Sequence, residues 1–231
     1  MISVFMPAYN EAPVLEDNVK RVVAALGGAD FELFVVDDSS TDGTGNVGRR
    51  LAAQDNRVKY VYCGGGPSRR ENLANSFSLA GGESVVFLDA DLSAPPKHIL
   101  ELVSMLNGYD IVIGSRYVPG SMADRSPLRL AFSRFARFMT RILFDTRISD
   151  HQCGLKAFRR DIILKLVEEA GYDKTMSRGF AWDTEILIRA QRMGCRIAEA
   201  PVEWMESGRT SVRILRDWRM LPYMIGLSLR L

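Results

Sequence analysis

Short apolar runs alternate with amphipathic segments along the first half of the chain. Each run is followed within two residues by Pro, Asp or Gly, which is the pattern of a buried strand that ends in a loop. We expect these strands at 2–6, 31–36, 58–62, 85–88 and 110–113. Apolar residues recur at helical spacing between them, so we expect helices at 14–26, 44–53, 73–80 and 98–106. This alternation predicts an α/β fold with a mostly parallel sheet and helices on both faces.

After residue 120 the pattern changes to longer amphipathic segments. The segment 127–145 places an apolar stripe rich in Phe opposite a polar face of Arg residues with no acidic residue between them. A second segment, 211–231, mixes Arg with Leu, Trp and Tyr, and Pro222 is expected to kink it or to end its first helix. Both segments are typical of helices that lie in the interface of an anionic membrane. For the first segment, packing against the protein core is the alternative.

The composition is that of a folded, globular protein. Of the 231 residues, 47% are hydrophobic and 25% are charged, and the formal net charge is +2. Because the total charge is close to zero, it does not indicate a class of binding partner. No nucleic-acid partner is expected. The length fits one domain over 1–231, or one domain with an appendage.

The cellular location is predicted from the chain start and the cysteines. The first residues, MISVFMPAYNE, contain no basic segment before a long apolar core, and no apolar run reaches about 18 residues, so we expect neither a signal peptide nor a transmembrane helix. Cys63, Cys153 and Cys195 are far apart and form no CxxC pair, which favours a reducing compartment. The expected location is the cytoplasm, with peripheral attachment to the inner face of a membrane.

Polar residues follow several of the expected strands at the point where each strand ends. They are Tyr9, Asn10 and Glu11 after the first strand, Asp37 and Asp38 after the second, Asp89 and Asp91 after the fourth, and Ser115 and Arg116 after the fifth. The carboxyl ends of parallel strands meet at one edge of a sheet, where open α/β folds bind their ligands. The pattern therefore predicts a functional site at this edge.

Asp89 and Asp91 are two residues apart, so in extended chain their carboxylates point to the same side. Like charges at this distance raise each other's pKa, and a divalent cation removes that penalty. Mg²⁺ and Mn²⁺ prefer such oxygen ligands and can share them with phosphate groups. The alternative is a loop with two solvated acids, one of which caps the helix that begins near Pro96.

Asp38 could accept hydrogen bonds from a nucleobase or a ribose at the end of the second strand. Asp37 or Asp42 is the candidate to cap the helix that begins near Gly43. The chain contains neither GxGxxG after its first strand nor the P-loop sequence GxxxxGK[ST], which argues against an ordinary NAD-binding protein or ATPase.

Several motifs in order resemble those of one enzyme family. PAYNE (7–11), VVDDSSTDGT (35–44), FLDADLS (87–93) and GSRY (114–117) are together similar to the family 2 glycosyltransferases, which have the GT-A fold. DHQCGLKAF (150–158), GFAWDTEIL (179–187) and PVEW (201–204) resemble the polyprenyl-phosphate, or dolichyl-phosphate, hexose synthases. The resemblance implies an inverting transfer of a hexose from UDP-glucose or GDP-mannose to a polyprenyl or dolichyl phosphate. The second group of motifs is closer to the glucose-transferring branch.

The resemblance also implies roles for individual residues on the donor side. The base and ribose of the nucleotide would be bound by Pro7, Tyr9, Glu11 and Asp38. Mg²⁺ or Mn²⁺ would be held by Asp89 and Asp91, with Ser93 as a minor candidate ligand. Lys156 would contact the donor diphosphate or the acceptor, with a surface residue as the alternative. The catalytic residues implied are Asp89, Asp91, Arg116 and Asp183.

On the acceptor side, a lipid phosphate is already anionic and needs cations around it rather than a general base. The residues implied are Ser115, Arg116, Arg129, Ser133 and Arg209. For each Arg an exposed, solubilising charge is the alternative. Asp183 would position the acceptor, with a structural ion pair as its alternative. Relatives often contain Ser-Lys where this chain has Gly208-Arg-Thr-Ser-Val212, so the cation there would come from Arg209 or Arg213, or be absent.

Three other functions are considered. A soluble glycosyltransferase that acts on a sugar hydroxyl would use Asp183 as a base and would need no membrane. An inactive GT-A module would bind only membranes or nucleotides, although the intact DADLS motif and Arg116 argue against it. A nucleotidyltransferase is disfavoured because the Gly-rich, Lys-containing loop that such enzymes use near the N-terminus is missing.

Overall fold

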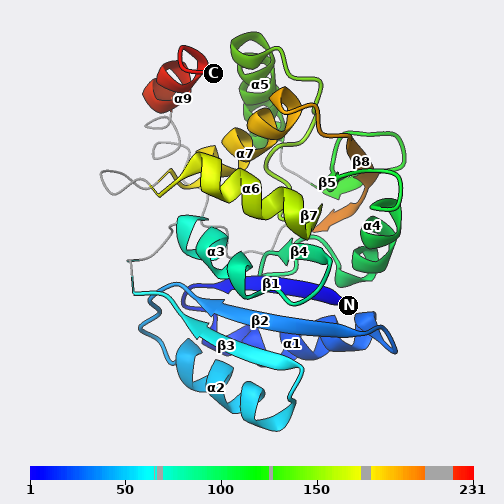
Figure 1. Ribbon diagram of the computed structural model, residues 1–231, viewed down its shortest axis with the longest axis vertical. Helices are drawn as coiled ribbons and strands as arrows, with labels where there is room; N and C mark the ends of the chain where they lie inside the picture. The colour runs from blue at the N-terminus through cyan, green and yellow to red at the C-terminus, as the bar shows by residue number, and fades with distance from the viewer. Residues whose placement is uncertain (65, 67–69, 125–126, 173–177, 206–220) are drawn as a thin grey trace.

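The structure is a computed structural model of residues 1–231 (Figure 1). It describes all residues except 65, 67–69, 125–126, 173–177 and 206–220. At 124, 127–132, 180 and 221 it describes the backbone alone.

A seven-stranded sheet forms the centre of the fold. Its strands are β1 (Ile2–Ala8), β2 (Phe31–Asp37), β3 (Val58–Tyr62), β4 (Ser84–Leu88), β5 (Ile111–Ser115), β7 (Leu155–Arg159) and β8 (Ile197–Pro201). They lie in the order β3-β2-β1-β4-β7-β5-β8, and only β7 runs antiparallel to its neighbours in this described sheet. A separate two-stranded sheet pairs β6 (Met122–Asp124) with β9 (Glu203–Met205). The predicted mostly parallel α/β sheet is confirmed.

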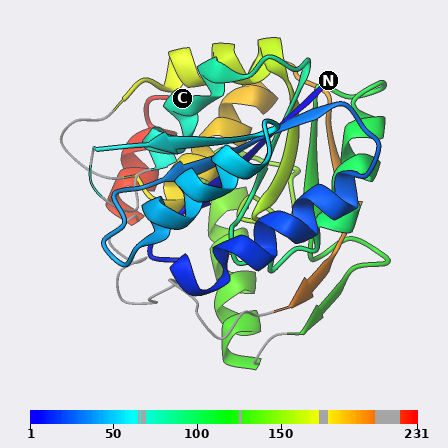
Figure 2. The same cartoon turned by 90° about the horizontal axis from the view of Figure 1, so that it is seen from below.

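Helices cover both faces of the sheet. They are α1 (Ala12–Leu26), α2 (Thr44–Gln54), α3 (Arg70–Ser76), α4 (Ile99–Met105), α5 (Pro127–Phe144), α6 (Arg160–Ala170), α7 (Phe180–Arg192) and α9 (Leu221–Ser228). Residues of α1, α2 and α4 share one apolar core with the sheet, and residues of α3, α6 and α7 share the other. Figure 2 shows α1 and α2 on one side of the sheet and α6 on the other.

Strand β1 illustrates why the sheet was predictable. Val4 and Met6 belong to one core and Phe5 to the other, because successive side chains of a strand point to opposite faces. All three are completely buried. A strand covered on both faces is therefore a continuous apolar run in the sequence rather than an alternating one.

The elements expected in the first half of the chain are present, with shifted ends. The helix expected at 73–80 begins at Arg70 and ends in a 3₁₀ turn, Phe77–Leu79. The 3₁₀ turn Pro96–His98 precedes α4. The pattern does not predict β7 or β8, because Lys156 and Glu199 interrupt their short apolar runs.

The two expected amphipathic helices have different outcomes. Helix α5 matches the helix predicted at 127–145. Helix α9 begins beside Pro222, which is tolerated in the first turn of a helix, while residues 211–220 of the second predicted segment lie outside the described residues. Leu227 of α9 packs with Phe144 and Ile188. Within the described part of the chain, no helix has the length and apolar character needed to cross a membrane.

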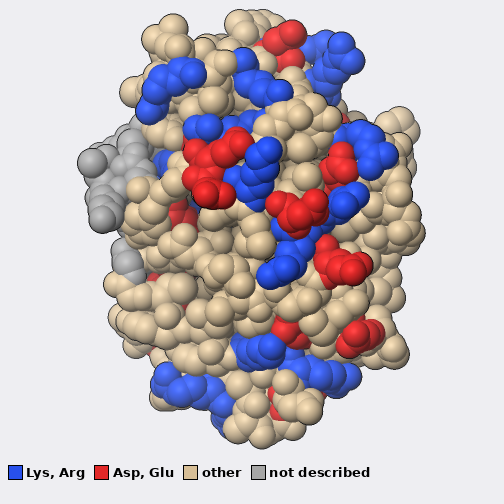
Figure 3. Space-filling model, viewed as in Figure 1, with Lys and Arg blue, Asp and Glu red and all other residues tan. Residues whose placement is uncertain are grey.

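Charged side chains of both signs are spread over the surface. Figure 3 shows Lys and Arg interspersed with Asp and Glu on the face it displays. Some form pairs between distant segments, such as Arg196 with Asp110 at 3.0 Å. This mixed distribution agrees with the formal net charge of +2.

Phe77 anchors the end of α3 to the sheet. Its ring is fully buried and meets the Phe5 ring edge-on at 5.1 Å. We expect Phe77→Ala to lower the free energy of unfolding by about 3–5 kcal/mol, because the change leaves a cavity in the core. Urea denaturation measures this. Leu79→Ala in the same 3₁₀ turn is the control, since Leu79 is half exposed and its loss should change stability by less than about 1 kcal/mol. Equal losses of stability in the two variants would contradict the placement of the Phe77 ring in the core.

Candidate functional site

The polar residues that follow the strands gather at one edge of the sheet. Leu88, the last residue of β4, lies opposite Leu155, the first residue of the antiparallel β7. The Asp89 N–H donates to the Gly154 carbonyl oxygen at 3.0 Å. The start of β7 therefore reaches the same edge as the carboxyl ends of the parallel strands and adds Lys156 to them.

Four charged side chains form a cluster at this edge: Arg70, Lys156, Asp89 and Asp183. The Arg70 guanidinium donates from Nε to Asp183 Oδ2 at 3.1 Å and from Nη2 to Asp89 Oδ1 at 3.2 Å. Lys156 Nζ donates to Asp183 Oδ1 at 3.1 Å and to the Cys153 carbonyl oxygen at 2.7 Å. Lys156 and Asp183 are buried, so each charge needs the other. Burial raises the pKa of the Asp89 carboxyl, and the Arg70 charge opposes that rise.

Gly154 sets the position of Asp89. A Cβ atom built on Gly154 would lie 2.0 Å from Asp89 Oδ2, so no larger residue fits there without moving the carboxylate. Gly154 belongs to the DHQCGLKAF motif, but the motif alone predicts no role for it.

Asp91 is held by its neighbour Ser93. The Ser93 N–H donates to Asp91 Oδ1 at 3.0 Å, and the Ser93 hydroxyl donates to Asp91 Oδ2 at 2.9 Å. Leu92, between them, has a φ of 50° and turns the chain sharply. Two carboxylates from one turn suit a hard divalent cation such as Mg²⁺ or Mn²⁺. Among the described residues, no group of three His, Cys, Asp or Glu side chains is placed to hold a metal ion.

The loops after β1 and β2 are joined by hydrogen bonds. The Asn10 N–H donates to Ser40 Oγ at 3.0 Å, and the Thr41 N–H donates to Asn10 Oδ1 at 2.8 Å. The Glu11 N–H donates to Thr44 Oγ1 at 2.9 Å. Of the predicted nucleotide-binding residues, Pro7 lies on β1, Tyr9 and Glu11 lie in the loop after it, and Asp38 lies in the loop after β2. The hydrogen bonds between the two loops therefore bring these residues to one place.

The acidic residues of the second loop have different partners. Asp38 Oδ1 accepts a hydrogen bond from Asn72 Nδ2 at 2.6 Å. Asp37 Oδ2 accepts one from the Tyr60 hydroxyl at 2.7 Å. Asp42 Oδ1 accepts from the N–H of Thr44, the first residue of α2, at 3.0 Å. Asp42 is therefore the residue that binds the start of this helix.

Arg116 lies in a buried ion pair. Its Nε and Nη2 atoms donate to the two carboxylate oxygens of Asp150, both at 2.7 Å. Burial opposes the charge of Asp150, but the Arg116 charge and hydrogen bonds hold its pKa below the usual range. The guanidinium also lies over the Trp204 ring at 4.6 Å. Ser115 is fully buried beside it.

The other predicted acceptor residues are less fully described. Ser133 lies on α5 and is partly exposed. The side chain of Arg129 and the whole of Arg209 lie outside the described residues. The acceptor roles of all five residues remain predictions.

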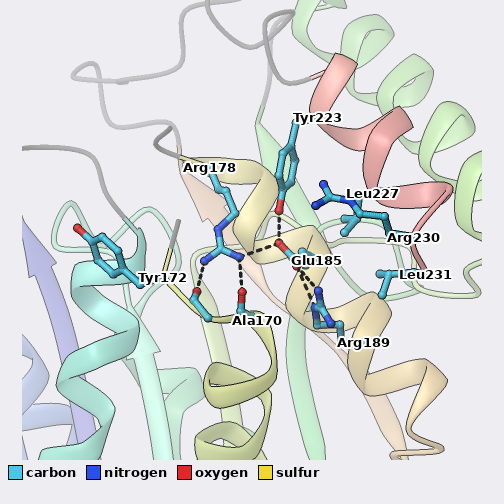
Figure 4. Close-up of a pocket in the computed structure, with 10 residues that line it drawn as sticks. Ala170, Tyr172, Arg178, Glu185, Arg189, Tyr223, Leu227, Arg230 and Leu231 are labelled. Atoms are coloured by element: carbon cyan, nitrogen blue, oxygen red, sulfur yellow. Dashed lines mark hydrogen bonds and ion pairs between the residues drawn. The ribbon is translucent and has the colours of Figure 1, made fainter. Parts of the chain in front are cut away.

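Helix α7 presents its two acidic residues to different surroundings. Asp183 and Glu185 are two positions apart, which separates them by about 200° around the helix. Glu185 accepts hydrogen bonds from Arg178 at 3.0 Å, from Arg189 at 2.8 Å and from the Tyr223 hydroxyl (Figure 4). These residues line a cavity of about 580 Å³ that also includes Leu227 of α9. Asp183 and its cations lie on the other face of α7.

Sequence reasoning missed Arg70. It lies in GGGPSRRE, which has the composition of a loop, and no motif includes it. The only local signal is its place: it follows the third strand, at the edge where the other strand ends supply polar residues.

Helix α5 exposes an apolar stripe on its outer surface. Phe135, Phe138 and Ile142 are 49%, 59% and 62% exposed and follow helical spacing. Arg134 and Arg141 are exposed on the same helix. Helix α9 packs against α5 and exposes Ile225, and Leu229, directly after the helix, is exposed too.

The family model described as Glycosyl transferase family 2 matches residues 3–167. Glycosyltransferase AglD of Haloferax volcanii is 38% identical over 222 residues, which cover 94% of this chain and 35% of AglD. The chain thus spans about a third of AglD. Polyprenol monophosphomannose synthase of Mycolicibacterium smegmatis is 33% identical over 88% of this chain and 77% of its own length.

Among solved structures, the fold is similar to glucosyl-3-phosphoglycerate synthase from Mycobacterium tuberculosis in complex with Mn²⁺, UDP-glucose and phosphoglyceric acid. The TM-score is 0.72 at 22% identity, over all of this chain and 79% of that one. At this identity the likeness concerns the fold.

If Asp89 is a metal ligand, as the sequence predicts, Gly154→Ala should weaken binding of Mn²⁺, because the new methyl group would push the Asp89 carboxylate from its position. We expect the dissociation constant for Mn²⁺, measured by electron paramagnetic resonance, to rise by about tenfold or more. Gly108→Ala is the matched control, since its Cβ would meet only the Met105 carbonyl oxygen, at 3.9 Å. Unchanged Mn²⁺ affinity in Gly154→Ala would show that Asp89 does not bind the metal.

Proposed function

The chain belongs to glycosyl transferase family 2 and has the GT-A fold, and on this premise we propose that it transfers a hexose from a nucleotide sugar to a polyprenyl or dolichyl phosphate at a membrane surface. The observation that supports this proposal most is the engagement of Asp183 by Arg70 and Lys156. The names of the relatives from Mycolicibacterium smegmatis and Micrococcus luteus, polyprenol monophosphomannose synthase and undecaprenyl-phosphate mannosyltransferase, point to the same acceptor class. We propose residues 1–231 as one catalytic domain.

On the donor side, the joined loops after β1 and β2 would bind the nucleoside. Asp38 lies next to β1, since its N–H donates to the Ala8 carbonyl oxygen at 2.9 Å. The backbone of Asp38 therefore lies beside the end of β1, and the next residue, Tyr9, is 41% exposed and would offer an aromatic surface to a base. Pro7 and Glu11 complete this proposed group.

Asp89 and Asp91 would hold Mg²⁺ or Mn²⁺ together with the donor diphosphate. Both are carboxylates at the edge of the sheet. Ser93 donates hydrogen bonds to both oxygens of Asp91, so its first role would be to orient Asp91 rather than to bind the metal. A bound cation stabilises negative charge on the departing nucleoside diphosphate. The rest of its coordination would come from diphosphate and water oxygens.

Asp183 distinguishes the two kinds of acceptor. A sugar hydroxyl must lose a proton to a base, whereas a lipid phosphate needs no base. Each oxygen of Asp183 accepts a hydrogen bond from a cation, Oδ1 from Lys156 and Oδ2 from Arg70. A carboxylate held in this way is suited to position cations. This favours the phosphate acceptor over the hydroxyl acceptor.

The acceptor phosphate would be bound near α5 and β5. Arg116 belongs to this proposed group, although Asp150 holds its guanidinium, and Ser115 lies buried beside it. Arg129, Ser133 and Arg209 would contribute from α5 and from the segment before α9. Bidentate Arg contacts match the geometry of phosphate oxygens.

The exposed stripe of α5 would rest on the membrane. Phe138 and Ile142 would enter the apolar boundary, and Arg134 and Arg141 would contact anionic headgroups. We propose a peripheral position on the cytoplasmic face. The lipid acceptor would then reach the site within the plane of that surface.

The enzyme should form a lipid-linked hexose when it is incubated with Mn²⁺ or Mg²⁺, a short polyprenyl phosphate, and UDP-glucose or GDP-mannose. We expect Asp91→Ala to reduce turnover by about 100-fold or more, because the cation loses a ligand. Thin-layer chromatography of labelled product measures this. Asp30→Ala, at a site that is 80% exposed, is the matched control and should keep full activity. No lipid-linked product from any nucleotide hexose would refute the proposed reaction.

Phe138→Ser should weaken binding to vesicles that contain phosphatidylglycerol. Loss of one inserted aromatic ring reduces the partition coefficient by about tenfold, and sedimentation with vesicles measures it. Leu100→Ser on α4 is the control, because Leu100 is 40% exposed and lies away from α5. Equal binding by wild type and Phe138→Ser would place the membrane contact elsewhere.

A further inference from the structure

Arg70 joins two carboxylates that belong to distant parts of the chain. Asp89 follows β4, and Asp183 lies in the first turn of α7. The guanidinium contacts Asp183 through Nε and Asp89 through Nη2, at 3.1 and 3.2 Å. It also lies over the Phe87 ring at 5.3 Å. Arg70 is thus a positive charge placed directly on the first carboxylate of the DxD motif.

The two ends of this bridge differ in how firmly they are held. The Asp183 side chain is 2% exposed, and its other oxygen accepts a hydrogen bond from the buried Lys156. The Asp89 side chain is 31% exposed and lies at the open edge of the sheet. Asp183 is therefore the fixed anchor of Arg70, and the contact with Asp89 is the end that a ligand can reach.

We propose that Arg70 competes with a divalent cation for Asp89, and that Asp183 holds Arg70 in place for this competition. The inference rests on the proposed function, in which Asp89 is a metal ligand. A guanidinium and a divalent cation both need the oxygens of Asp89, and their like charges repel at this distance. Mn²⁺ or Mg²⁺ must therefore displace Arg70 from Asp89 Oδ1 or share the carboxylate at a cost in affinity.

This competition has a consequence for the order of binding. A site whose own cation opposes the metal binds Mn²⁺ weakly by itself. The anionic diphosphate of a donor adds negative charge and favours the metal over Arg70. Arg70 thus makes metal binding depend on the donor.

Titration of the full-length protein with Mn²⁺ alone, followed by electron paramagnetic resonance of the unbound ion, tests this. We expect Arg70→Gln to bind Mn²⁺ about 10-fold more tightly than wild type, because one charged hydrogen bond to Asp89 no longer has to be broken. Arg70→Lys keeps the charge, but a single ammonium group replaces the guanidinium that bonds both carboxylates. Its affinity for Mn²⁺ should therefore lie between those of wild type and Arg70→Gln. Arg57→Gln, whose Arg pairs with Asp55 on the surface, is the matched control and should bind like wild type.

The variants separate competition from simpler explanations. If Arg70 only ties α3 to α7, Arg70→Gln lowers the melting temperature and leaves Mn²⁺ affinity unchanged or weaker, which overturns the inference. If Arg70→Gln and Arg70→Lys both bind Mn²⁺ like wild type, neither the charge nor the hydrogen bonds of Arg70 oppose the metal, which also overturns the inference. Arg70→Lys remains the test if Arg70→Gln does not fold. If Asp91→Ala abolishes Mn²⁺ binding, the proposed metal site is upheld, whatever the Arg70 variants do. If Mn²⁺ binding survives in Asp91→Ala, the proposed metal site is wrong, and so is the inference about Arg70.

Discussion

Buried opposite charges determine how the site is built. Lys156 and Asp183 are both excluded from water, and neither charge is stable there without a partner. Their pairing requires that β7 bring Lys156 to the edge of the sheet and that α7 begin directly above it. Arg70 then extends the cluster to Asp89 and draws α3 into the same arrangement. The cation–carboxylate network thus links the loop after β4 to helices α3 and α7.

The antiparallel β7 is what makes this network possible. A parallel strand between β4 and β5 would have placed its amino end at the opposite edge of the sheet. Because β7 is reversed, Gly154 and Lys156 lie beside the carboxyl end of β4. Gly154 leaves room for the Asp89 carboxylate, and Lys156 supplies the charge below it. The single reversed strand therefore adds Lys156 to the edge at which Asp89 and Asp91 follow β4.

The sequence predicted the parts of the fold and the site that depend on local pattern. Strands β1 to β5 were predicted from their short, largely apolar runs, and Asp89 and Asp91 were recognisable because they follow one of them. Contacts between distant segments were not predictable. Arg116 binds Asp150, which is 34 residues away, and Arg70 binds Asp183, 113 residues away. Nothing in the residues around Arg70 indicates that partner, and β7 was missed because Lys156 interrupts its apolar run.

We propose that cations, rather than a general base, receive the acceptor. The most direct measurement gives the enzyme one donor and two acceptors of equal chain length, a polyprenyl phosphate and the corresponding polyprenol, in the same detergent. We expect glycosylation of the phosphate alone, because Lys156 and Arg70 engage both oxygens of Asp183. Transfer of the hexose to the polyprenol hydroxyl, at a rate that falls with protonation of a carboxylate, would contradict it.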